Sequence, residues 1–187
     1  MSANDRARWD TLYSQRTLEP YPEPDPLLFH YTLPVDADGT QRALDLAGGQ
    51  GQNALWLAEQ GYTVDLMDIS RIALRRAQDE MTSRELRNIN FFQVDFDQVI
   101  LQPENYDLIC VFRFLSSKIM PQVRAAVRPG GRIIYETFNS GHLKTRPDFN
   151  PDYLLQAGEL VGYFADWRIL HAAELSATSQ VVAVKPE

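Results

Sequence analysis

The segment 43–70, ALDLAGGQGQNALWLAEQGYTVDLMDIS, constrains the fold of this chain more than any other part of the sequence. A short apolar run stops at Gly48, Gly49 and Gly51, after which apolar residues recur at helical spacing. A second apolar run follows and ends at Asp68, about 20 residues past the glycines. The order strand, glycine turn, helix, strand and acid is typical of α/β sheets that bind an adenosine-bearing cofactor.

The length of 187 residues fits one domain with a substantial core. We expect a single domain, 1–187, in which residues 1–34 form an N-terminal helix and a proline-rich cap and residues 41–187 form the core. The cap is predicted to contain a short amphipathic helix over 4–15 and an extended segment over 21–28, where prolines alternate with other residues.

The composition also limits the partners and the compartment. A formal net charge of -7 disfavours nucleic acid, and the arginines between Arg71 and Arg87 alternate with acids as on a solvated helix face. Cys110 is the only cysteine, which excludes an internal disulfide and favours a reducing compartment. The sequence shows neither a signal-peptide pattern nor an apolar run long enough to cross a bilayer, so we expect a cytoplasmic protein without a membrane partner.

From residue 41 onward, strand patterns and helix patterns alternate, which predicts a mostly parallel sheet covered by helices. Two closing strand patterns are joined by a short connection and should pair antiparallel. The expected strands are 43–47, 62–67, 89–94, 106–112, 132–138, 167–172 and 179–184, and the expected helices are 52–60, 70–86, 117–127 and 151–163, with a turn at 128–131.

These patterns, taken in order, resemble the class I S-adenosylmethionine-dependent methyltransferases from residue 41 to 187. The resemblance depends on the glycine-loop motif that begins at Asp45, on Asp68-Ile69-Ser70 after the second strand, and on Asp95-Phe96 after the third. It also depends on the apolar strand that ends at Phe112-Arg113-Phe114-Leu115. Within the family, the segments YETFNSGHL and NPDYLLQAGEL are similar to small methyltransferases related to tellurite-resistance proteins. The resemblance implies a Rossmann-like three-layer α/β sandwich whose seven-stranded sheet is mostly parallel and has an antiparallel C-terminal strand.

The resemblance further implies S-adenosyl-L-methionine as cofactor, S-adenosyl-L-homocysteine as product and no metal. It assigns Asp45 to the methionine end, Gly49 and Gly51 to close backbone approach, Asp68 to the ribose and Asp95 to the adenine. Ile69 and Phe96 would sandwich the adenine ring. The complete expected cofactor set is Asp45, Ala47, Gly48, Gly49, Gly51, Asn53, Asp68, Ile69, Ser70, Asp95, Phe96 and Phe112.

For the methyl acceptor, the sequence offers fewer candidate binding residues. Arg113 can bind an anionic acceptor or pair with a neighbouring acid, and His142 can act as a base or be a solvated loop residue. Phe114 and Glu136 are further acceptor-site candidates near strand ends. Trp9, Tyr13 and Tyr21 can form a lid over the cofactor or cover apolar core.

Two other functions fit part of the same pattern. The glycines followed by Ala54, with Asp68 at ribose distance, also satisfy the fingerprint of an NAD(P)-dependent oxidoreductase. A catalytically silent protein that binds the cofactor or a partner is the third possibility. The acids Asp45 and Asp95 favour a methyltransferase with a small-molecule acceptor, while the acceptor atom, which could be oxygen, nitrogen, sulfur or a metalloid, and the oligomeric state stay open.

Overall fold

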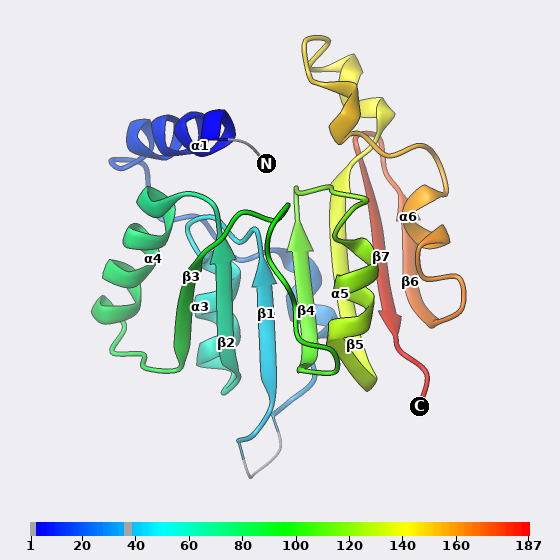
Figure 1. The fold of residues 1–187 in the computed structure, drawn as a ribbon, viewed down its shortest axis with the longest axis horizontal. Coiled ribbons are helices and arrows are strands. Elements are labelled where there is room, and N and C mark those ends of the chain that lie inside the picture. Colours follow the sequence, from blue (N-terminus) through cyan, green and yellow to red (C-terminus); the bar gives the residue numbers. More distant parts are fainter. Residues whose placement is uncertain (1–2, 36–38) are drawn as a thin grey trace. The chain divides into compact units, whose positions relative to one another are not determined.

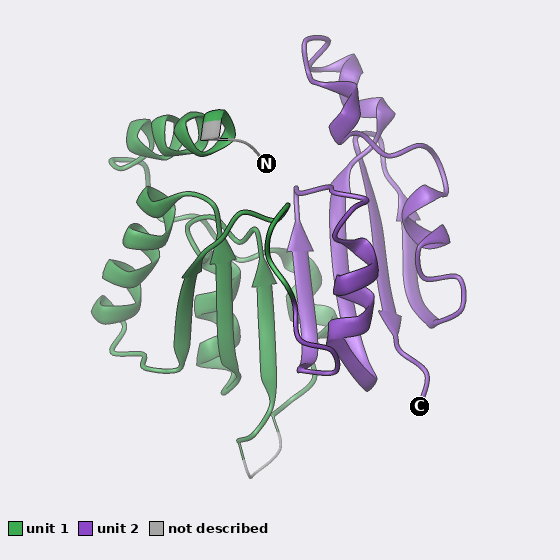
Figure 2. Ribbon diagram, viewed as in Figure 1, with its two compact units in different colours: residues 1–100 green, residues 101–187 purple. Residues whose placement is uncertain are grey.

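The computed structural model of the chain describes residues 3–35 and 39–187. It divides into two compact units, Met1–Ile100 and Leu101–Glu187 (Figure 2). The expectation of one domain, with a cap over 1–34 and a core over 41–187, stays a prediction. Met1 and Ser2 of that cap lie outside the described residues.

The first unit contains three parallel strands in the order β3-β2-β1, together with four helices (Figure 1). Helices α3 and α4 pack on these strands, and α1 packs on α4. Apart from α2, the observed elements match the predicted ones to within three residues at each end. They are α1 (Ala3–Gln15), α2 (Pro26–Tyr31), β1 (Arg42–Leu46), α3 (Gln52–Glu59), β2 (Thr63–Asp68), α4 (Arg71–Ser83) and β3 (Ile89–Gln93).

Helix α2 corrects the prediction of an extended segment over 21–28. The chain is extended only up to Asp25, whose carboxylate accepts a hydrogen bond from the Leu27 backbone N–H and caps the helix. Pro26 occupies the first helical turn, where a proline leaves no backbone donor unsatisfied. The alternating prolines therefore end at a helix start, and Leu28 is fully buried.

The second unit contains four strands in the order β4-β5-β7-β6 (Figure 1). β4 and β5 are parallel, whereas β7 pairs antiparallel with both β5 and β6, as the closing strand patterns predict. The strands and helices are β4 (Tyr106–Phe112), α5 (Met120–Ala126), β5 (Val127–Phe138), α6 (Glu159–Gly162), β6 (Arg168–Glu174) and β7 (Thr178–Val184), with two 3₁₀ helices, η1 (Ser140–Lys144) and η2 (Pro151–Tyr153).

The predicted helix over 151–163 is wrong. A single 3₁₀ turn at η2 is followed by extended backbone at Leu154, and α6 begins only after Gly158, which has a φ of 77°. Leu155 is fully buried and forms an isolated parallel bridge with Asn139. The apolar pair Leu154-Leu155 is thus buried from an extended segment.

The predicted turn 128–131 also differs from the structure, because β5 already begins at Val127. The register between β4 and β5 shifts at this point, so the turn forms an irregularity inside the strand. Among the described residues, none of the helices has the length and apolar character needed to cross a membrane. The same residues contain no group of three or more His, Cys, Asp or Glu side chains arranged to hold a metal ion.

Candidate functional site

The loop that joins β1 to α3, residues 47–51, is called the glycine loop here. Ala47, Gly49 and Gly51 have φ values of 56°, 59° and 77°, so the chain passes through the left-handed region three times. This conformation is easy for glycine and costs about 1 kcal/mol or more for alanine. Gly51 also donates its backbone N–H to the Gly48 carbonyl at 2.9 Å. The loop is therefore a compact turn, in which Gly49, Gln50 and Gly51 are buried.

Asp45 fixes this loop from inside the unit. Its side chain is fully buried, and Oδ2 accepts a hydrogen bond from the Ala54 N–H at 3.1 Å. A Cβ atom at Gly48 would overlap the same carboxylate and also Leu66. Asn53, the next predicted residue, accepts the backbone N–H of Asp25 at 2.8 Å. In the structure, Asp45 thus holds the start of α3, and Asn53 attaches the N-terminal segment to it.

Asp68 connects the glycine loop to the start of α4. Oδ2 accepts the Gly49 N–H and Oδ1 accepts the Ser70 N–H, both at 2.8 Å. Burial raises the pKa of Asp68 to about 6, and the hydrogen bonds from Ser70 and Gly49 offset part of this increase. Ser70 in turn caps α4, since its Oγ accepts the Ala73 N–H. Each carboxylate oxygen can accept a further hydrogen bond.

Helix α1 reaches the same place from the N-terminal side. The Tyr13 hydroxyl lies so close to Gly49 that a Cβ at this glycine would overlap it. Trp9 stacks on Tyr13 with ring centroids 5.9 Å apart. Asp10 accepts a hydrogen bond from the Ser70 hydroxyl at 2.6 Å. Of the predicted lid residues in α1, Tyr13 contacts the glycine loop, and Trp9 stacks against Tyr13.

Tyr21 contacts the glycine loop as well, because its hydroxyl donates to the Gln50 carbonyl. Burial raises the pKa of this hydroxyl above its ordinary value. Arg76 lies over the Tyr21 ring and donates to the carbonyl oxygens of Arg16 and Glu19. Tyr21 and Arg76 therefore fix the chain that follows α1.

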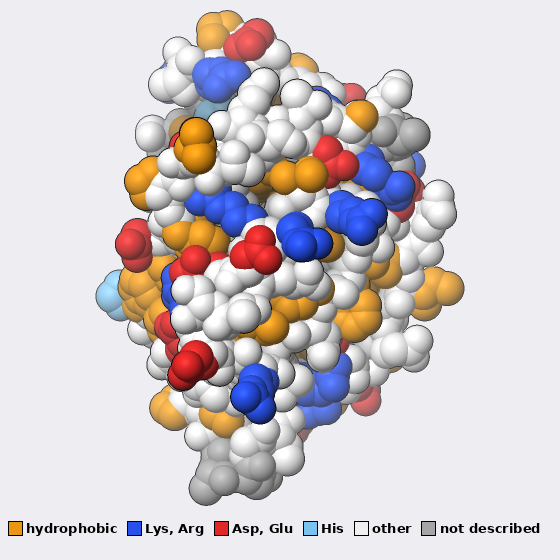
Figure 3. All heavy atoms as spheres, turned by 90° about the vertical axis from the view of Figure 1, so that its left-hand side faces the viewer, with side chains coloured by type: hydrophobic (Ala, Val, Ile, Leu, Met, Phe, Trp, Pro, Cys, Tyr) orange, Lys and Arg blue, Asp and Glu red, His pale blue; other side chains and the backbone are white. Residues whose placement is uncertain are grey.

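The sequence reasoning missed the hydrogen bond between Asp10 and Ser70 and those from Arg76 to the chain that follows α1. The arginines of α4 were expected to form a solvated face, and Figure 3 shows basic and acidic side chains interspersed on this side of the molecule. Arg75 fits that expectation, since it is exposed and lies 3.7 Å from Asp79. Arg76 differs because its partners are backbone carbonyl oxygens, which leave no charge pattern in a sequence.

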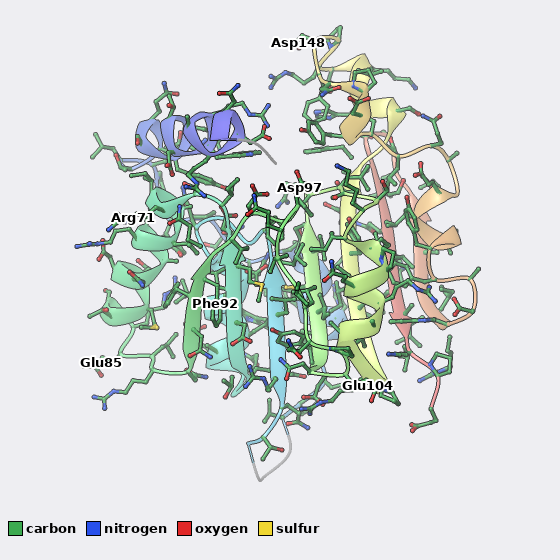
Figure 4. All side chains as sticks on the ribbon, viewed as in Figure 1. Arg71, Glu85, Phe92, Asp97, Glu104 and Asp148 are labelled. Carbon is green, nitrogen blue, oxygen red and sulfur yellow. The ribbon has the colours of Figure 1, made fainter. Side chains whose placement is uncertain are left out.

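Three further predicted residues follow β2 and β3. Ile69 and Phe96 are each only 3% exposed. Asp95 is half-buried, and its Oδ1 accepts the Asp97 N–H at 3.0 Å. Figure 4 labels Asp97 in the loop after β3, to which Asp95 also belongs. The Asp95 carboxylate therefore stabilises the turn of its own loop.

In the second unit, the predicted residues near the strand ends form a second group. Arg113 follows β4 with a φ of 57° and donates its backbone N–H to the Glu136 carbonyl at 2.9 Å. The Tyr135 hydroxyl donates to the Phe114 carbonyl at 2.9 Å, and Phe112 is 7% exposed. The Glu136 carboxylate accepts a hydrogen bond from Gln180, which the sequence reasoning did not single out.

His142 lies outside this group, in an aromatic cluster. Its ring stacks on Phe138 at 4.2 Å between centroids and meets Phe149 edge-on at 4.9 Å. The cluster joins Phe138, the last residue of β5, to the segment that follows, in which Figure 4 labels Asp148. His142 is thus half-buried among aromatic rings.

Comparison with known proteins shows which family and which fold this chain resembles. Residues 43–131 match the family described as "Methyltransferase domain". TehB of Haemophilus influenzae, named as an S-adenosyl-L-methionine-dependent methyltransferase, is 28% identical over 141 residues, which cover 71% of this chain and 48% of TehB. Hemagglutinin 1 of Eikenella corrodens is 33% identical over 141 residues, which cover 71% of this chain and 46% of that protein. The chain therefore spans about half the length of these curated relatives.

Solved structures support the fold. The crystal structure of TehB has a TM-score of 0.68 at 19% identity and covers 85% of this chain and 65% of that one. A structure from work on the conversion of a disulfide bond into a thioacetal group during echinomycin biosynthesis has a TM-score of 0.73 at 19% identity and covers 97% of this chain and 92% of that one. The predicted Rossmann-like class, mostly parallel with an antiparallel C-terminal strand, is confirmed.

Residues 43–131 match a methyltransferase domain, and the similarity to TehB agrees with the class I S-adenosylmethionine-dependent family and the tellurite-resistance-related subgroup that the sequence indicates. S-adenosylmethionine is the cofactor that this family implies. The roles of the individual site residues remain proposals.

Proposed function

We propose that this protein transfers a methyl group from S-adenosylmethionine to a small-molecule acceptor by in-line displacement. The observation that supports this most is the buried Asp68 carboxylate, which joins the glycine loop to the start of α4 at the end of β2. In sheets of this kind, ligands bind beside the carboxyl ends of the strands. A carboxylate with remaining acceptor capacity at that place suits a ribose with two hydroxyl donors.

The glycine loop fits the same cofactor. Gly48 and Gly49 let the loop pack directly against Asp45 and Tyr13, because added side-chain atoms would overlap them. Asp45 fixes the loop that would lie along the methionine end, and Asp95 is the candidate for the adenine amino group. Ile69 and Phe96 are the candidates for the two sides of the adenine ring, and each is 3% exposed in this structure.

The chemistry of the bound cofactor is that of a sulfonium, whose positive sulfur already makes the methyl group electrophilic. The protein must therefore mainly orient two reactants and exclude water, and positioning of this kind can supply about 7–11 kcal/mol of a barrier. Tyr13 and Tyr21, held on the glycine loop, are suited to cover the cofactor. Arg113 and Glu136 are proposed to bind the acceptor, with His142 as a candidate base.

The acceptor is proposed to be small because the net charge of -7 opposes a polyphosphate partner. Oxygen, nitrogen, sulfur and metalloid acceptors all suit the residues present. A cytoplasmic location and the absence of a membrane partner belong to the same proposal.

Calorimetric titration tests the cofactor, and a turnover screen tests the reaction. We expect S-adenosylmethionine and S-adenosylhomocysteine to bind and NAD to leave the heat signal at baseline. We then expect S-adenosylhomocysteine to be produced in a screen that begins with thiols and chalcogen oxyanions. Binding of NAD in place of the sulfonium cofactor would support an oxidoreductase. Cofactor binding without turnover over a broad screen would support a catalytically silent protein.

A further inference from the structure

The first unit contains a pocket of about 300 Å³ that the proposed reaction does not use. It lies between the proline-rich segment, the outer face of α3 and the C-terminal end of α4. The lining residues are Tyr21, Pro22, Glu23, Pro24, Phe29, Gln52, Trp56, Glu59 and Arg84.

Two aromatic rings form one corner of this pocket. Phe29 and Trp56 meet edge to face, with centroids 5.2 Å apart and an interplanar angle of 64°. Phe29 is 52% exposed although it is a large apolar side chain, so its ring is open to solvent. The Tyr21 ring contributes less, because Arg84 already lies over it at 5.5 Å. A ligand would therefore meet Phe29, Trp56 and the two prolines.

The charges around the pocket favour a cationic ligand. Glu23 and Glu59 line it together with a single guanidinium, that of Arg84. This guanidinium is already paired with Glu59 at 3.0 Å and with Glu80 at 2.9 Å. An anion would have to displace these carboxylates, whereas a cation gains from Glu23 and, to a smaller extent, from Glu59, which it shares with Arg84.

We propose that this pocket is a binding site for a small organic cation with alkyl groups around its charge, such as a quaternary ammonium. The indole face attracts such a cation more strongly than other rings do, and the effect is worth about 0.5–2 kcal/mol. A quaternary ammonium has no N–H donor that needs a partner, so prolines and rings form a suitable wall. The inference is independent of the proposed methyl transfer, because none of its binding residues is assigned to the cofactor or the acceptor apart from the wall residue Tyr21.

The test uses choline chloride as probe and 3,3-dimethyl-1-butanol as its uncharged isostere. The chain contains three tryptophans, so a nitrogen–proton correlation spectrum shows three indole signals, and Trp56→Phe assigns one of them. We expect choline to move the Trp56 signal saturably and to bind at least fivefold tighter than the isostere, about 1 kcal/mol. Equal binding of the two compounds, or an unmoved Trp56 signal, overturns the proposal.

Variants test the charge and the rings separately. Glu23→Gln is expected to weaken choline binding at least threefold, whereas Glu19→Gln, the same change outside the pocket, is expected to leave it within 1.5-fold, roughly the precision of such titrations. Phe29→Leu is expected to weaken it at least twofold, and this exposed position keeps the test valid even where a Trp56 variant fails to fold. Glu23→Gln and Glu19→Gln with equal effects would contradict the site.

Discussion

The glycine loop of the first unit and the segment 140–154 of the second unit hold their residues in different ways. In the glycine loop, buried carboxylates from two strands accept the backbone N–H groups, and the neighbouring side chains leave no room for an added atom. Segment 140–154 is mostly exposed and relies on local turns, on His142 stacked over Phe138 and meeting Phe149 edge-on, and on a close approach of Gly141 to the Ser176 carbonyl. A cofactor shared by a whole family suits a fixed loop, whereas an acceptor that differs between proteins suits a segment with few constraints.

The largest effect that would sharpen this comparison is expected from Gly48→Ala. The added methyl group would overlap the Asp45 carboxylate and Leu66, so we expect the free energy of unfolding to fall by about 3 kcal/mol. Chemical denaturation measures this change. Gly162→Ala in the second unit is the control, because no atom lies within 4 Å of its added methyl group, and we expect it to change stability by less than about 1 kcal/mol. Equal effects of the two substitutions would contradict the close packing around Gly48.

The pH dependence of stability gives the next largest effect. The folded-state pKa of Asp68, about 6, lies above its ordinary value of 3.8, so the folded protein holds this proton more tightly than the unfolded chain does. The stabilisation is therefore complete at low pH and is lost as the pH rises through 6, by about 2 kcal/mol between pH 4 and pH 7. Denaturation of the wild-type protein and of Asp68→Asn over this range measures the difference. Parallel curves for the two proteins would contradict it.

Asp68→Ala tests the same carboxylate for binding. We expect cofactor affinity to fall at least tenfold, about 1.4 kcal/mol, because the ribose acceptor and the support of Gly49 are lost together. Calorimetry with S-adenosylhomocysteine gives the affinity. Asp79→Ala removes an exposed acid of α4 and should leave the affinity unchanged. Unchanged affinity in Asp68→Ala would remove this residue from the site.

The smallest effect is expected in the second unit, from His142→Ala. Loss of the stacking on Phe138 should lower the free energy of unfolding by about 1 kcal/mol or less. Cofactor affinity should stay within about twofold, which is a change of only a few tenths of a kcal/mol. Lys144→Ala, a change in the same 3₁₀ helix, is the control variant. A tenfold loss of cofactor affinity in His142→Ala would show that the two regions are not separate in function.

The sequence predicted the first unit well because its signals are local and agree with one another. Glycines mark the turn after β1, Ser70 caps α4, and the apolar runs end at acids. Asp45 and Asp68 were chosen from their position at strand ends. Their actual partners, the N–H groups of Ala54 and Gly49, depend on how the loop folds back and could not be predicted from spacing.

The second unit was harder to predict because tertiary contacts decide its local structure. Pro151 is a residue that commonly opens a helix, yet only a 3₁₀ turn follows it, and Leu155 is buried in extended backbone beside Asn139. The contact of Gln180 with Glu136 joins residues far apart in the sequence, and Gln180 belongs to no motif. In the first unit, the same is true of Asp10 in its contact with Ser70.

Asn139 and Leu155 have a consequence for how proteins of this architecture can diverge. Ser140 donates its N–H to Leu155, and Leu155 donates its own to Phe138, so the chain leaves the sheet and returns to it at one point. What lies between can lengthen, shorten or be exchanged while both ends stay in register, because closing a longer loop costs only about 0.6 kcal/mol per doubling of its length. Under the proposed function, exchanging this segment between related proteins would test whether it sets the acceptor preference without rebuilding the sheet.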